Sequence, residues 1–192
     1  MKSVMRWIAI ALVVAGVSGC VTPKPNMSNS DVSTKTVEVQ RDKALVYFVR
    51  PNFLGFAINA AVYDGDKFIG VVPYDTKLPY VADPGSHTFM VVSESADFMK
   101  AELVAGKTYY AQVTPRMGAW KARFSLDPMT RTEFADARQR IDAAKPIENK
   151  PSALKWAQDN NASVQEKKAA NWIKWNEKPA EQRPFLKAED GQ

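Results

Sequence analysis

The middle of the chain carries apolar and polar residues in patterns that predict β-strands. Residues 44–50, with the sequence ALVYFVR, form an apolar run that ends at Pro51. Their β-branched and aromatic content favours a buried strand over a helix. Between Trp120 and Leu126, apolar residues alternate with polar ones. This period of two is typical of a strand with one face buried.

Turn signals separate further short runs of this kind. Asp64-Gly65-Asp66-Lys67 is a strong hairpin signal, and Asp83-Pro84-Gly85 marks another turn. Between residues 41 and 128 we therefore expect about seven strands at a spacing of roughly 8–12 residues. The predicted fold class is mainly β, an antiparallel β-sandwich that occupies residues 41–128.

The last third of the chain has a helical period instead. Thr130-x-x-Glu133 and Ser163-x-x-Glu166 both match the capping box that opens helices. Pro146 and Pro151 bound a linker, and Ser152 can cap a short helix after it. About three helices follow from these signals. Residues 129–192 are predicted to form a helical C-terminal extension.

Three of the five Trp residues, Trp156, Trp172 and Trp175, lie in this extension. One interpretation makes them a surface for a glycan or a protein partner, because aromatic rings dominate such contacts. The other makes them packing residues that hold the helices on the β domain. Short helices gain little stability without tertiary contacts. We therefore expect at least one of the three rings to be mostly buried.

The N-terminus has the pattern of an export signal. Two basic residues, Lys2 and Arg6, precede an uncharged and largely apolar stretch that ends at Gly19. That stretch is short for a membrane span, which needs about 20 apolar residues. Val17, Ser18 and Gly19 then precede Cys20. This sequence resembles the bacterial lipobox, and the resemblance implies cleavage before Cys20 and lipidation of its thiol.

Residues 1–19 are therefore predicted to be a lipoprotein signal peptide, and residues 20–40 a flexible tether rich in Pro, Asn and Ser. The acyl chains would anchor the protein stably to a membrane. Val21, rather than Asp, follows the Cys, and by resemblance to Gram-negative sorting rules this favours the outer membrane. The expected location is the cell envelope, on the outer membrane facing the periplasm. A cleaved ordinary signal or an uncleaved anchor helix are the alternatives.

Charge and rare residues exclude several classes of function. The chain has 26 Lys and Arg against 21 Asp and Glu, with the signs interspersed rather than gathered in a basic stripe. This pattern does not favour nucleic-acid binding. One Cys and one His exclude an intramolecular disulfide, a multi-Cys metal site and a His–His metal pair. His87 shares a predicted strand face with Phe89, which favours a structural role for it.

A resemblance to known families covers the predicted β domain. Residues 62–92, with a DG turn, a Gly-x-x-Pro end and a Pro-Gly-x-His-Thr start, resemble a PEGA-type β module. This segment is followed by AGKTYY at residues 105–110 and by RMGA at residues 116–119. The same order of motifs is typical of the bacterial lipoprotein family catalogued as domain of unknown function 2846, which this part of the chain resembles. That family has no assigned chemistry. The resemblance implies a β fold and a lipoprotein context only.

We therefore expect a lipid-anchored envelope protein with a non-enzymatic binding or structural role. No nucleophile elbow, phosphate-binding Gly loop or metal-ligand spacing appears in the sequence. The sequence thus predicts no catalytic residue, cofactor or metal. The alternative is a module that binds carbohydrate or peptidoglycan through exposed aromatic rings.

Overall fold

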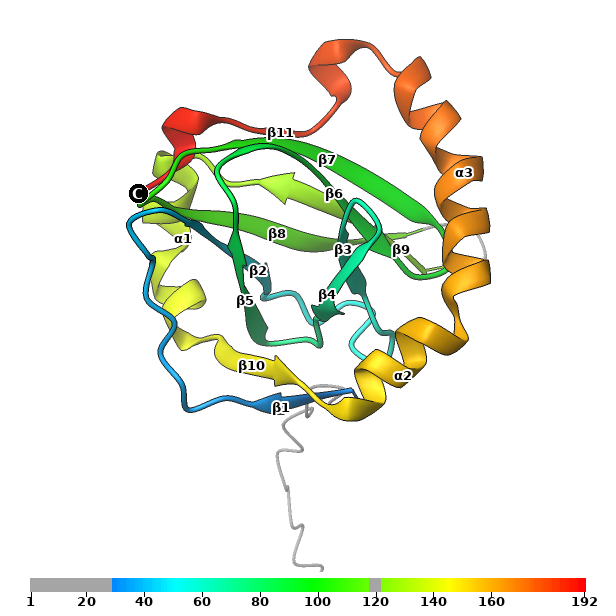
Figure 1. The fold of residues 1–192 in the computed structure, drawn as a ribbon, viewed down its shortest axis with the longest axis horizontal. Helices are drawn as coiled ribbons and strands as arrows, with labels where there is room; N and C mark the ends of the chain where they lie inside the picture. The colour runs from blue at the N-terminus through cyan, green and yellow to red at the C-terminus, as the bar shows by residue number, and fades with distance from the viewer. Residues whose placement is uncertain (1–28, 118–121) are drawn as a thin grey trace, which may run out of the picture.

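The computed structural model describes residues 29–117 and 122–192. Within these residues the chain forms eleven β-strands and three α-helices, and the strands belong to two sheets (Figure 1). The mainly β prediction is confirmed.

The larger sheet has six strands with β2 near its middle. Residues 44–50 form β2, as the apolar run predicts. β2 pairs antiparallel with β5 and parallel with β8. In spatial order, the six strands are β1 (Ser30–Val32), β10 (Lys145–Asn149), β5 (Thr76–Ala82), β2 (Ala44–Arg50), β8 (Thr108–Met117) and β9 (Ala122–Pro128).

The smaller sheet has five strands, and three of its four pairings are antiparallel. The predicted hairpin turn joins two of them, with Gly65 at a positive φ of 58°. Glycine adopts this conformation without a steric cost. In spatial order, the strands are β11 (Phe185–Leu186), β7 (Ala96–Leu103), β6 (Gly85–Val92), β3 (Ala61–Asp64) and β4 (Lys67–Val71).

The prediction of purely antiparallel pairing is wrong. The pairs β2–β8, β5–β10 and β7–β11 are parallel, so both sheets are mixed. Turn signals reveal hairpins, whose strands are antiparallel by construction. They carry no information about strands such as β2 and β8, between which most of the smaller sheet is inserted.

One hydrophobic cluster draws side chains from both sheets. Alternate residues of β2, including Val46 and Phe48, belong to this cluster together with Phe89 of β6 and Met99 of β7. The rings of Phe48 and Phe89 meet edge to face at 5.2 Å. The other residues of β2 face the opposite side, where Val49 packs in a second cluster. β2 is apolar along its length because both of its faces are covered.

Helix α1 (Arg131–Ala143) covers this second face of the larger sheet. Ala137 and Ile141 pack there against Val49. The predicted capping box is present: the Glu133 N–H donates to Thr130 Oγ1 at 3.2 Å, and the Thr130 N–H donates to the Glu133 carboxylate at 2.8 Å.

Helices α2 (Pro151–Asp159) and α3 (Asn161–Glu177) cover the smaller sheet on its side away from the shared cluster. α3 runs along one side of the molecule in Figure 1. The second predicted capping box is wrong, because α3 begins at Asn161 and Ser163 lies inside it. Asn160 both ends α2 and precedes α3, so Ser163 is not at a free helix start.

The segments predicted as tether and helical extension also contain strands. β1 lies in the predicted tether, where Ser30 is buried and donates from Oγ to the Val71 carbonyl at 2.8 Å. β10 and β11 lie in the C-terminal third and join different sheets. Two short 3₁₀ helices, Ala180–Gln182 and Ala188–Asp190, complete that third. The predicted helical C-terminal extension therefore contains strands as well as helices.

Candidate functional site

Trp175 is a packing residue. Its side chain is 2 % exposed, and its Nε1–H donates to the Phe98 carbonyl on β7 at 3.0 Å. Lys100 and Arg183 place their cations near its ring, at 5.8 and 5.5 Å from the centroid. A ring enclosed in this way offers no face to a sugar. The prediction that at least one of the three Trp is mostly buried is confirmed.

Trp172 and Trp156 are half-buried on the same side of the smaller sheet. The Trp172 ring stacks on Trp175 at 5.3 Å and meets Phe98 edge to face at 4.9 Å. Trp156 lies 6.5 Å from Phe68. The three predicted rings thus come together around two strands as packing groups. Only the exposed parts of Trp172 and Trp156 remain for a ligand.

A polar groove lies between β7, the β8–β9 pair and the end of α3. Its volume is about 460 Å³, and the Trp175 and Phe124 side chains contribute to its lining. Six charged side chains also line it: Arg116, Arg123, Lys174, Lys178, Asp97 and Asp127. Four cations and two carboxylates give the groove a positive balance. We call it the α3 groove.

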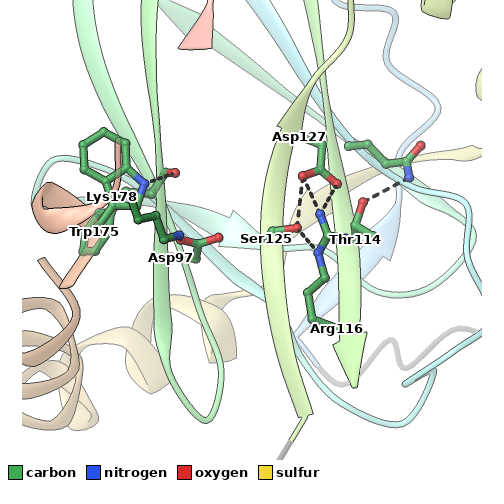
Figure 2. Close-up of polar contacts among 9 residues, drawn as sticks. Asp97, Thr114, Arg116, Ser125, Asp127, Trp175 and Lys178 are labelled. Carbon is green, nitrogen blue, oxygen red and sulfur yellow. Dashed lines mark hydrogen bonds and ion pairs between the residues drawn. The ribbon is translucent and has the colours of Figure 1, made fainter. Parts of the chain in front are cut away.

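One side of the α3 groove is a polar ladder on β8 and β9. Arg116 donates from Nη2 to Asp127 at 2.9 Å and from Nε to Ser125 Oγ at 2.8 Å (Figure 2). Ser125 in turn donates to Asp127 at 3.1 Å. These side chains share a face because residues two apart on a strand point the same way. The ladder holds the Arg116 guanidinium in a fixed position at the groove.

On the other side, Asp97 of β7 faces Lys178 at the end of α3 (Figure 2). Their charged atoms are 3.6 Å apart. Burial raises the pKa of Asp97, and the neighbouring ammonium opposes that rise. Among the described residues, Arg123 and Lys174 form no ion pair. These two cations are therefore free to meet an acidic group.

The α3 groove has only a partial signal in the sequence. The alternation in residues 120–126 was the available signal, because it places Arg123 and Ser125 together on the polar face of β9. The pairing of β8 with β9 then adds Arg116. The proximity of α3 had no local signal, since Lys178 lies far along the chain from β7.

His87 belongs to a separate, partly buried cluster. Its Nδ1 lies 2.8 Å from Asp64 Oδ2, and its Nε2 lies 2.8 Å from the Asp83 carbonyl. Tyr80 donates to the same Asp64 oxygen at 2.9 Å. The imidazole stacks on Phe89 at 5.6 Å, on the strand face that the sequence indicates. The hydrogen bond with Asp64 is the main reason that the pKa of His87 is raised.

Both ring nitrogens of His87 face acceptors, so the doubly protonated ring satisfies both contacts. The cluster links the turn after β3 to the turn before β6. It is therefore a structural clamp between these two turns. In the described ranges 29–117 and 122–192, no group of three or more His, Cys, Asp or Glu could hold a metal ion.

The predicted lipidation residue, Cys20, and the cleavage motif Val17, Ser18 and Gly19 lie outside the described residues. Of the helices that the structure does describe, none has the length and apolar character needed to cross a bilayer.

Comparison with known proteins gives little further information. No family model and no solved structure matches the chain. An uncharacterised protein of Haemophilus influenzae is 24% identical over 139 residues, which cover 71% of this chain and 81% of that protein. Its name assigns no activity, and this identity does not establish a family. The resemblance to the lipoprotein family of unknown function therefore stays a prediction.

Proposed function

We propose that this protein is a lipid-anchored protein of the bacterial cell envelope with a non-enzymatic binding role, and that the α3 groove is its binding site. The groove's positive balance carries the second part of the proposal. Arg116 and Lys178 are already paired with carboxylates, whereas Arg123 and Lys174 have no ion pair among the described residues. An acidic segment of an envelope protein fits these two cations.

The proposed frame for this site is a β-sandwich with helices on its outer faces. The hydrophobic cluster that both sheets share supports that arrangement. The groove then lies at one side of the sandwich, where β7 approaches β9 and α3 ends. Rigid strands on one side and a packed helix on the other keep the charged side chains in place.

The resemblance of residues Val17–Cys20 to a lipobox supports the lipid anchor, and Val21 after the Cys favours attachment to the outer membrane. We predict that Cys20→Ser abolishes membrane anchoring, because the thioether is the attachment point. Metabolic labelling with a clickable fatty acid should mark the natural chain and leave the variant unlabelled. Equal labelling of both chains would contradict the anchor.

Crosslinking in intact cells tests the binding site. A photoreactive residue at Lys174 should capture a defined envelope partner, whereas one at Lys155, exposed on α2, should not. The double variant Arg123→Glu/Lys174→Glu should abolish the capture, because it reverses the charge offered to an acidic partner. Capture that survives this reversal would overturn the assignment of the groove.

Binding to carbohydrate or peptidoglycan is the second candidate. An open hollow of about 480 Å³ on the other side of α3 supports it. Trp172 lines this hollow beside the polar groups of Thr88, Gln165 and Lys168. A ring with hydrogen-bonding neighbours is a common arrangement for holding a sugar. Retention on insoluble peptidoglycan that Trp172→Ala removes and Trp156→Ala preserves would favour this function.

A further inference from the structure

The loop between β2 and β3 carries an exposed aromatic patch. Phe53, Leu54 and Phe56 are 49 %, 49 % and 41 % exposed. The two Phe rings stack at 4.8 Å, and Tyr74 meets Phe53 edge to face at 5.5 Å. Residues 51–60, with the sequence PNFLGFAINA, contain no charged side chain. Adjacent exposed rings of this kind mark a contact surface.

Arg50 holds this loop in a fixed shape. Its buried guanidinium donates from Nη1 to the Ile58 carbonyl at 2.8 Å and to the Val72 carbonyl at 2.9 Å, and from Nη2 to the Gly55 carbonyl. The ring of Phe124 lies 4.4 Å from the guanidinium carbon. Gly55 takes a positive φ of 70°, which suits glycine. The aromatic side chains therefore sit on a preformed support rather than on a loose loop.

The described chain begins close to this patch. Ser30 of β1 donates to the Val71 carbonyl, and the next carbonyl, that of Val72, accepts from Arg50. Arg50 contacts Gly55, between the two stacked rings. In Figure 1 the loop that follows β2 lies near the start of β1. The residues that precede Asn29 thus join the folded part on the same side as the patch.

Eight residues separate Cys20 from Asn29, and the nine steps from one Cα to the other span at most about 32 Å. An acyl chain on Cys20 would therefore keep this end of the protein near the bilayer surface. We propose that Phe53, Leu54 and Phe56 insert into the interfacial region of the phospholipid bilayer that carries the lipid anchor. This inference rests on the proposed lipidation. Insertion would fix the orientation of the folded part and present the α3 groove in a constant direction.

A fluorophore on the loop tests the insertion in the full-length lipidated protein. Leu54→Cys supplies a single reactive thiol, because the chain's one Cys is alkylated in the lipidated protein. Val104→Cys is the matched control, as Val104 is 40 % exposed and lies near the start of β2, the opposite end from the loop. Both labelled proteins are reconstituted in vesicles of phosphatidylethanolamine and phosphatidylglycerol that contain a nitroxide-labelled lipid.

We expect quenching several-fold stronger at position 54 than at position 104, and Phe53→Ser should lower it at position 54. Flotation of the protein with the vesicles reports the anchor separately. Floating protein with equal quenching at both positions would overturn the insertion and leave the anchor intact. Equal quenching, together with crosslinking between the position-54 thiols of two copies when the Leu54→Cys protein is left unlabelled, would assign the patch to a second copy of the chain. Protein that does not float would overturn both proposals.

Discussion

At the scale of single residues, Trp175 joins α3 to the smaller sheet. It is among the largest side chains with almost no exposure, and its indole N–H is satisfied by the Phe98 carbonyl. Removal of the ring would leave a cavity and an unpaired carbonyl in the same place. Both losses destabilise a folded protein.

We predict that Trp175→Ala lowers the free energy of unfolding by about 3–5 kcal/mol. Ile173→Ala on the same helix is the control, because Ile173 is exposed and its loss should change stability by about 0.5 kcal/mol or less. Urea unfolding followed by circular dichroism measures both values. Similar losses for the two variants would show that α3 is held by something other than the Trp175 contact.

His87 gives the protein a pH-dependent clamp. Its folded pKa is raised above the usual 6.5, mainly by Asp64. A raised pKa means that the contribution to stability is present below about pH 6.5 and is lost as the pH rises through the folded value. Two neighbouring groups must keep a constant charge over the pH range in which His87 titrates. They are Tyr80, which also donates to Asp64, and Lys43, which pairs with Asp83.

An NMR titration checks this prediction directly, because the chain has a single His and therefore one imidazole signal. The pKa of His87 should lie above 6.5 in the natural protein and return toward 6.5 in Asp64→Asn. Asp66→Asn, two residues along the chain and paired with Lys168 instead, should leave it unchanged. A pKa insensitive to Asp64→Asn would contradict the clamp.

At the scale of elements, local sequence patterns were sufficient to place some strands and insufficient to place others. The apolar run at residues 44–50 and the turn at residues 64–67 are strong enough to identify β2 and the β3–β4 hairpin. β10 and β11 are short and have little pattern of their own, because their place depends on strands distant in sequence. The α3 groove has the same origin: long-range packing brings α3 to a polar strand face.

The two sequences that match a capping box differ in the structure. Thr130 caps α1, whereas Ser163 lies inside α3. We predict that Thr130→Ala costs about 1 kcal/mol of stability. Ser163→Ala should have no cost or a small benefit, because Ala has the better helix propensity. Chemical denaturation of the two variants separates them, and an equal loss in both would restore Ser163 as a cap.

At the scale of the whole molecule, the C-terminal third covers apolar faces of both sheets. α1 covers the larger sheet, and α2 and α3 cover the smaller one. Ile147 of β10 and Leu186 of β11 also enter the cluster shared by the two sheets. Eight of the eleven strands lie within residues 41–128, and β1, β10 and β11 lie outside them. The Trp residues of the last third indicated helices packed on the strands, but no local pattern showed that strands from that third also join the sheets.

This arrangement changes the expectation for a protein that ends at Met129. Such a chain keeps every strand signal of the central region, and on those signals alone it should fold. It would nevertheless expose Val49 and Tyr110 on one sheet and Phe98 on the other, and it would lose Ile147 and Leu186 from the shared cluster. Two uncovered apolar faces are incompatible with a stable small domain.

We predict that the truncated chain shows no cooperative thermal transition by circular dichroism, whereas the full chain does. A cooperative transition in the truncated chain would show instead that residues 41–128 fold independently and that the helices dock on a finished domain.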